Sequence, residues 1–150
     1  MPARPRCLPR RAAAAAVGSL CLLLGACSGF GPNDPRAGLS CIDDSPECVD
    51  RRQETLKAML SDNDHKWVRE PATPQAHASG VRLFAFRSRK KELSCEDLAL
   101  GRREADSVPK SLKGAKDLSP AQISRANLFA AEVSKELSAE MRARRCKTKG

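Results

Sequence analysis

Ser119-Pro120-Ala121-Gln122 opens the longest helical pattern in the chain. Serine is a preferred N-cap, proline suits the first helical position, and a glutamine three residues after the serine completes a capping box. An apolar face then recurs at helical spacing for about 25 residues, or about 38 Å of helix. Its members are Ile123, Ala126, Ala130, Val133, Leu137 and Met141. The pattern predicts a helix over residues 120–145.

Three upstream segments carry related signals. Ser45-Pro46 and Thr73-Pro74 repeat the cap followed by proline, and Ser94 with Asp97 resembles a capping box. Apolar residues follow each cap at helical spacing, and Pro109 ends the third pattern. The predicted helices cover residues 46–61, 74–91 and 95–108.

Residues 81–86 also fit a short strand, but no second strand is evident to pair its backbone groups, so we favour helix. The chain has four phenylalanines, one tryptophan and no tyrosine. Its core must therefore be aliphatic, which favours closely packed helices over a β-sandwich. Trp67 stands in an irregular segment between predicted helices. We expect it to fold back into the core; an exposed, ligand-binding tryptophan is the alternative.

The N-terminal segment is basic first and apolar second. Its charged head contains Arg4, Arg6, Arg10 and Arg11. The apolar run covers residues 12–24, which is about 20 Å of helix. A bilayer core is about 30 Å thick, so this run is too short for a comfortable span. The segment is typical of a secretory signal peptide.

The apolar run ends in Leu24-Gly25-Ala26-Cys27. This sequence resembles the lipobox of bacterial lipoproteins, a resemblance limited to residues 1–28. In that family the cysteine sulfur receives a diacylglyceryl group, a peptidase cuts before the cysteine, and the new N-terminus is acylated, for example with palmitate. The resemblance implies a cleaved signal peptide over residues 1–26 and a lipid on Cys27. In many Gram-negative bacteria Asp after the lipidated cysteine retains the protein at the inner membrane. Ser28 instead implies the periplasmic face of the outer membrane.

Cleavage before Cys27 would leave 124 of the 150 residues, which suits one domain. The formal net charge of +9 would fall to +5, because four arginines leave. This moderate excess does not predict nucleic-acid binding. Residues 28–40 are rich in glycine and proline, so we expect a lipid-anchored flexible tether over residues 27–40, with an ordered loop as the alternative. The helical domain would then cover residues 41–150.

Four cysteines remain after Cys27, namely Cys41, Cys48, Cys95 and Cys146. An even number in an exported domain indicates two disulfides. A zinc site is disfavoured because no two are as close as in Cys-x₂-Cys. Helices alternating up and down would place all four at one pole. Pairing Cys41 with Cys48 would close only a small loop, so we expect bridges that cross the helices, with both such pairings open. The predicted fold class is an all-α, disulfide-stapled bundle of about four helices.

No catalytic pattern stands out. His65 and His77 belong to no metal-ligand pattern and are expected to be solvated. Asp62, Asp64 and Glu70 are candidates for paired carboxylates, but acids clustered in a loop are usually solvated caps. The chain lacks a glycine-rich phosphate loop and a nucleophile elbow. We therefore predict no enzymatic activity, cofactor or metal site.

Two basic clusters end predicted helices at the same pole. They are Arg87, Arg89, Lys90 and Lys91 in the first, and Arg142, Arg144, Arg145 and Lys147 in the second. Cations at helix C-termini complement the helix dipole, which explains them structurally. Binding to an anionic envelope polymer is the functional interpretation.

These features predict a non-catalytic cell-envelope lipoprotein that acts as a structural or interaction module in the periplasm. The alternative is a binder of peptidoglycan or lipopolysaccharide through the basic helix ends. A periplasmic hydrolase is third. The expected partners are the membrane, through the lipid anchor, and an envelope protein or anionic polymer.

Overall fold

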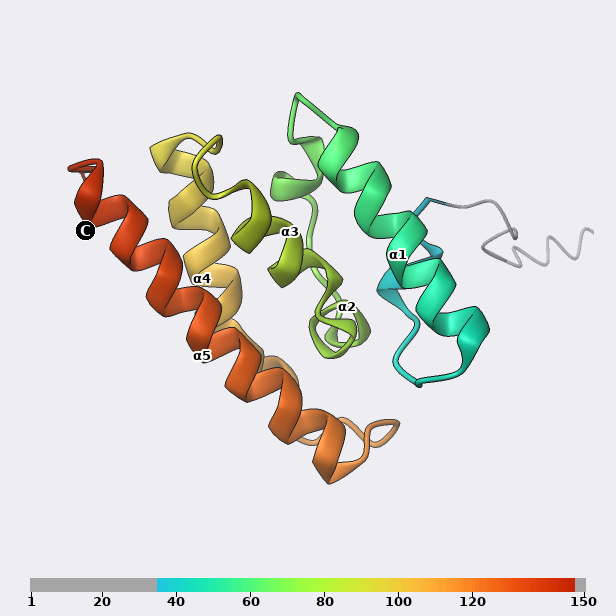
Figure 1. The fold of residues 1–150 in the computed structure, drawn as a ribbon. Helices are drawn as coiled ribbons and strands as arrows, with labels where there is room; N and C mark the ends of the chain where they lie inside the picture. The colour runs from blue at the N-terminus through green and yellow to red at the C-terminus, as the bar shows by residue number, and fades with distance from the viewer. Residues whose placement is uncertain (1–34, 148–150) are drawn as a thin grey trace, which may run out of the picture.

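Capped helices make up most of residues 35–147, the part of the chain that the computed structural model describes (Figure 1). The α-helices are α1 (Pro46–Ser61), α2 (Pro74–Ser79), α3 (Val81–Arg89), α4 (Cys95–Ser111) and α5 (Pro120–Ala143). Two short 3₁₀ helices, η1 (Ala37–Leu39) and η2 (Lys66–Arg69), flank α1. No strand occurs within residues 35–147. The all-α fold is confirmed, and residues 81–86 are helical.

The predicted caps start the helices. The hydroxyl groups of Ser45, Thr73 and Ser94 each accept a hydrogen bond from the backbone N–H three residues later. Ser119 and Gln122 form the complete, reciprocal capping box. Each such cap stabilises its helix by about 1 kcal/mol, because it satisfies a backbone donor that has no partner inside the helix.

The prediction of one helix over residues 74–91 was wrong. Gly80 adopts φ 72°, in the left-handed region, and it both ends α2 and precedes α3. Glycine takes this conformation without the penalty that a Cβ atom imposes. The chain therefore changes direction at Gly80, and the bundle has five α-helices in its described part instead of four.

The prediction that Pro109 ends the third helix was also wrong. α4 continues to Ser111, and the Leu112 N–H still donates to the Val108 carbonyl. Proline removes its own N–H from the hydrogen-bond ladder and its ring crowds the carbonyl four residues earlier, but the N–H groups of the following residues can still bond. Val108 and Leu112 are both fully buried, and their burial holds the last turn in place.

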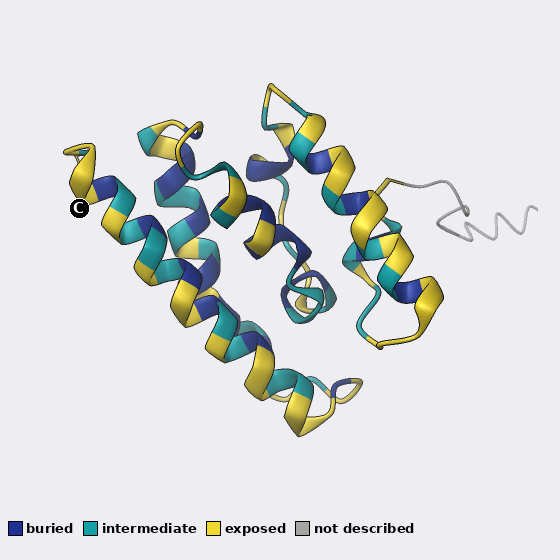
Figure 2. Ribbon diagram, in the orientation of Figure 1, coloured by how far each residue is buried: buried dark blue, intermediate teal, exposed yellow. Residues whose placement is uncertain are grey.

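α3 lies at the centre of the domain. α1 packs on one side of it, and the pair formed by α4 and α5 packs on the other (Figure 1). Most of α3 is buried, whereas α1 and α5 show buried positions on one face and exposed positions on the other (Figure 2). The apolar face predicted for the last helix points inward, because Ala126, Ala130, Val133, Leu137 and Met141 are all buried.

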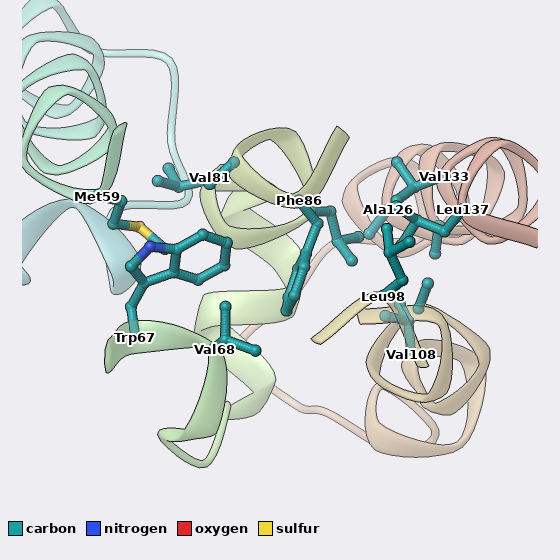
Figure 3. Packing of buried hydrophobic residues seen from close by; sticks show 14 of the residues in the cluster. Met59, Trp67, Val68, Val81, Phe86, Leu98, Val108, Ala126, Val133 and Leu137 are labelled. Atoms are coloured by element: carbon teal, nitrogen blue, oxygen red, sulfur yellow. The ribbon is translucent and has the colours of Figure 1, made fainter. Parts of the chain in front are cut away.

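Trp67 fills the core between η2 and α3, as predicted. Its ring meets Phe86 edge to face, with centroids 4.7 Å apart. Met59 of α1 lies beside the indole on its other side (Figure 3). The rest of the core is aliphatic, with valine and leucine side chains between α4 and α5.

One cation is buried inside this core. Arg82 in α3 is only 1% exposed. Its Nε and one terminal nitrogen donate to the two carboxylate oxygens of Glu104, at 2.8 and 2.6 Å. The two terminal nitrogens also donate to the carbonyls of Trp67 and Glu70, at 2.8 and 3.0 Å. The buried charge thus has a paired acid and satisfied hydrogen bonds, which such a charge requires.

The packed domain begins before the predicted boundary at residue 41. Gly38 in η1 is buried, and its N–H donates to the Thr55 hydroxyl at 2.9 Å. A Cβ atom at this position would lie 2.3 Å from the Arg51 carbonyl oxygen, so only glycine allows the approach. The last residues of the predicted tether are therefore ordered, while residues 27–34 lie outside the described residues.

The disulfide pairing also differs from the expectation. Cys41 bonds Cys48 across seven residues, and Cys95 bonds Cys146 across 51. Only the second bridge crosses helices, and the four cysteines do not share a pole. α1 begins on the side of the domain away from the end where α4 begins and α5 finishes (Figure 1). The break at Gly80 removes the strict alternation on which the one-pole expectation depended.

We expect the two bridges to contribute unequally to stability. In the chain-entropy model, a bridge across seven residues contributes about 2.4 kcal/mol and one across 51 about 4 kcal/mol. Replacing Cys95 and Cys146 by alanine should therefore lower the free energy of unfolding by more than the matched double replacement of Cys41 and Cys48. Urea denaturation of both variants measures the difference. If both double variants lost the same free energy of unfolding, the larger loop closed by the long bridge would not be the source of its stabilisation.

Candidate functional site

The two predicted basic clusters meet at one end of the domain. Lys90, just after α3, contacts the Glu136 carboxylate on α5. Arg144 at the end of α5 donates to the Leu93 carbonyl at 2.6 Å, next to the start of α4. The bridge from Cys95 to Cys146 fastens the same end. We call this region the basic end; it contains all eight predicted cations.

Half of these cations are neutralised or used structurally. Arg87 pairs with Glu136 at 2.6 Å, and Arg89 pairs with Glu92. The hydrogen bond and charge of Lys90, with the charge of Arg87, lower the pKa of the Glu136 carboxyl, which keeps it ionised. Arg144 satisfies a backbone carbonyl instead of an acid.

The other four cations are available at the surface. Lys91, Arg142, Arg145 and Lys147 are all exposed, and none forms an ion pair with an acid in residues 35–147. Four uncompensated charges at one end create a local positive potential, which attracts anionic ligands and is screened by salt. This subset is the part of the predicted patch that has the chemistry of a binding surface.

A second surface feature was not predicted. An apolar groove of about 430 Å³ lies between α1 and α5, with the junction of α2 and α3 as its floor. Leu56, Val81, Phe84 and Phe129 contribute apolar surface, and Phe84 is 45% exposed. A single exposed apolar side chain is ordinary, but contiguous apolar surface in a groove is typical of a binding surface. The sequence carries no local signal for this groove, because its lining residues come from helices that are far apart in the chain.

His77 is buried instead of solvated, contrary to prediction. It is 4% exposed, and neither ring nitrogen hydrogen-bonds another group within residues 35–147. Burial lowers the pKa of its imidazole; the nearby Glu104 carboxylate opposes this shift and the Arg82 cation adds to it. His77 therefore stays neutral at pH 7.

The loop acids do not form a carboxylate pair. The Asp62 carboxylate accepts from the N–H groups of Asp64 and Lys66, as a turn cap does. Glu70 pairs with Arg36 at 3.6 Å. No group of three or more His, Cys, Asp or Glu side chains in residues 35–147 is arranged to hold a metal ion.

The predicted lipid-attachment residue, Cys27, lies outside the described residues. Among the helices that are described, none combines the length and hydrophobicity needed to cross a membrane. Comparisons with protein-family models, curated proteins and solved structures found no match to this chain. Three features of the chain bear on its function, namely the predicted signal segment, the basic end and the groove.

Burial of His77 makes stability depend on pH. Its pKa is near 6.5 in the unfolded chain and lower in the folded domain, so the unfolded state binds more protons as the pH falls below about 6.5. Stability should be fully present above that pH and decline below it. Replacing His77 by leucine should reduce the loss, measured as the difference in unfolding free energy between pH 7.5 and pH 5. An unchanged difference would mean that other groups cause the acid sensitivity.

Proposed function

We propose that this protein is a lipid-anchored cell-envelope protein that works by binding and not by catalysis. Leu24-Gly25-Ala26-Cys27, at the end of a basic and then apolar segment, is the observation that carries the proposal. Acyl chains contribute about 0.8 kcal/mol per buried CH₂, and two or more chains give stable anchoring. The serine at position 28 supports the periplasmic face of the outer membrane as the location.

The features of the domain surface support the binding role. The basic end and the apolar groove both provide non-covalent attraction, one through charge and the other through apolar contact. Arg82 and Glu104 are the most deeply buried charged pair in the described residues. They bind each other, and Arg82 also donates to two backbone carbonyls, so no charged group of the pair is left for a ligand. Their role is accordingly structural.

Replacing Cys27 by serine tests the anchor, and replacing Cys21 by serine is the matched control within the same segment. The parent and the Cys21 variant should incorporate labelled palmitate, lose residues 1–26, and sediment with the outer-membrane fraction. The Cys27 variant should incorporate no label and should be soluble or uncleaved. A Cys27 variant that is labelled, processed and membrane-bound like the parent would refute the proposal.

A second candidate function is binding of anionic envelope polymer, peptidoglycan or lipopolysaccharide. It is favoured by the four uncompensated cations Lys91, Arg142, Arg145 and Lys147 at the basic end. The described chain begins beside α1, across the domain from this end (Figure 1). A domain held by its N-terminal side could thus present the basic end away from the membrane.

Replacing those four cations by glutamine should abolish retention on the polymer at low salt. The control variant replaces Lys57, Lys110, Lys113 and Lys116, which are exposed elsewhere, so both variants lose four charges. The parent and the control should bind at about 0.01 M salt and elute near 1 M, where screening acts within about 3 Å. Equal binding by the two variants would mean that net charge, and not the basic end, causes retention.

A further inference from the structure

The groove between α1 and α5 contains charge of one sign. Its walls are apolar except for a few polar groups, and the only charged side chains that line it are Arg52 and Arg125. No acidic side chain lines it. A ligand that fits must therefore have apolar surface for the walls and a negative charge for the arginines.

The two arginines are incompletely neutralised. Both approach Asp44, at 3.4 and 3.5 Å, and the Asp43 carboxylate also acts on Arg52, so Arg125 has only a share of one acid. Arg52 is fixed by the Asp43 carbonyl at 2.6 Å, whereas the Arg125 side chain is 60% exposed. An ion pair that is this exposed contributes little, so an incoming anion can replace Asp44 at Arg125 at small cost.

The aromatic wall is held in position before any ligand arrives. The Arg87 guanidinium lies 5.8 Å from the centre of the Phe129 ring. Arg87 is itself fixed by Glu136 at 2.6 Å. Phe84 faces the same groove from α3 and is about half exposed. Phe129 thus offers apolar contact area at low ordering cost, which favours binding, and Phe84 adds to that area.

The size of the groove favours a small ligand over a helix. Its volume of about 430 Å³ lies within the roughly 300–1,000 Å³ typical of small-molecule sites. A single turn of α-helix, 5.4 Å long and about 10–12 Å across, occupies about 400–600 Å³. The groove therefore has room for one extended apolar chain but not for several helical turns.

We propose that this groove binds a free fatty acid. The acyl chain would lie along Leu56, Val81 and Phe84 and against Phe129, and the carboxylate would meet Arg125. This site goes beyond the envelope-binding function proposed above and does not depend on the lipid at Cys27 or on the four uncompensated cations of the basic end.

The test uses the full chain with Cys27→Ser, so that the protein carries no lipid of its own. Dansyl-undecanoic acid serves as the fluorescent probe, and octanoate, decanoate and dodecanoate compete with it below their micelle concentrations. Affinity should increase about two- to fourfold for each added methylene group that is buried. Dodecyltrimethylammonium, with a positive head on the same chain length, should compete at least tenfold more weakly than dodecanoate.

Two pairs of variants assign binding to the groove. Phe84→Gln should weaken dodecanoate binding about tenfold, whereas Leu128→Gln, which removes a more exposed apolar side chain outside the groove, should not. Arg125→Glu should likewise weaken binding about tenfold, whereas Lys135→Glu on the exposed face of the same helix should not. Circular dichroism checks that each variant stays folded.

Three results would overturn the proposal. These are no displacement by dodecanoate, equal competition by the cationic amphiphile, or binding that Phe84→Gln leaves unchanged. Sedimentation at increasing protein concentration tests the other occupant: a dimer that Phe84→Gln dissociates would identify a second copy of the chain in the groove. None of these results affects the test of lipid attachment at Cys27. The fatty-acid proposal can therefore be refuted while the anchoring proposal stands, and the reverse.

Discussion

The guanidinium of Arg82 is almost completely buried, and the arrangement of the domain depends on the groups that neutralise and hydrogen-bond it. Desolvating such a charge costs several kcal/mol unless a paired acid and hydrogen bonds offset the cost. Glu104 of α4 supplies the acid, and carbonyls of the η2 segment supply the other acceptors. One side chain therefore ties three segments together and fixes α3 between them. With α3 central, α1 and α5 lie on opposite sides of it, and the groove is the space that remains between them.

The helices could be predicted from sequence because their signals are local. A cap such as Ser119 and its partner Gln122 are three residues apart, so neither depends on the rest of the fold. The break at Gly80 was missed because glycine also occurs inside helices at modest cost, and only the left-handed conformation distinguishes the two cases. That single break removed the alternation of helices on which the one-pole placement of the cysteines depended. The pairing was missed for a different reason, because the loop between Cys41 and Cys48 was judged too small to be favoured.

Charged residues were the least predictable part of the candidate site. Arg82 and His77 look like surface residues in sequence, and only the packing of α3 and α2 against α4 buries them. The basic clusters were identified residue by residue, yet their partial neutralisation was not, because Glu136 reaches Arg87 and Lys90 only across the contact between α3 and α5. The groove could not be predicted, since its lining comes from separate helices and no local sequence pattern shows that they come together.

The short bridge between Cys41 and Cys48 has a mechanical consequence. A pull on the chain before Pro35 enters the domain at η1, where the hydrogen bond from Gly38 to Thr55 is an early point of attachment. Peeling η1 away frees the backbone only as far as Cys41, because the disulfide then transmits the force directly to Cys48 and bypasses residues 42–47. Cys48 is buried in the first turn of α1, so the load acts on a packed helix and not on its frayed end. The disulfide therefore keeps residues 42–47 from being extended when the chain is pulled from its N-terminal side.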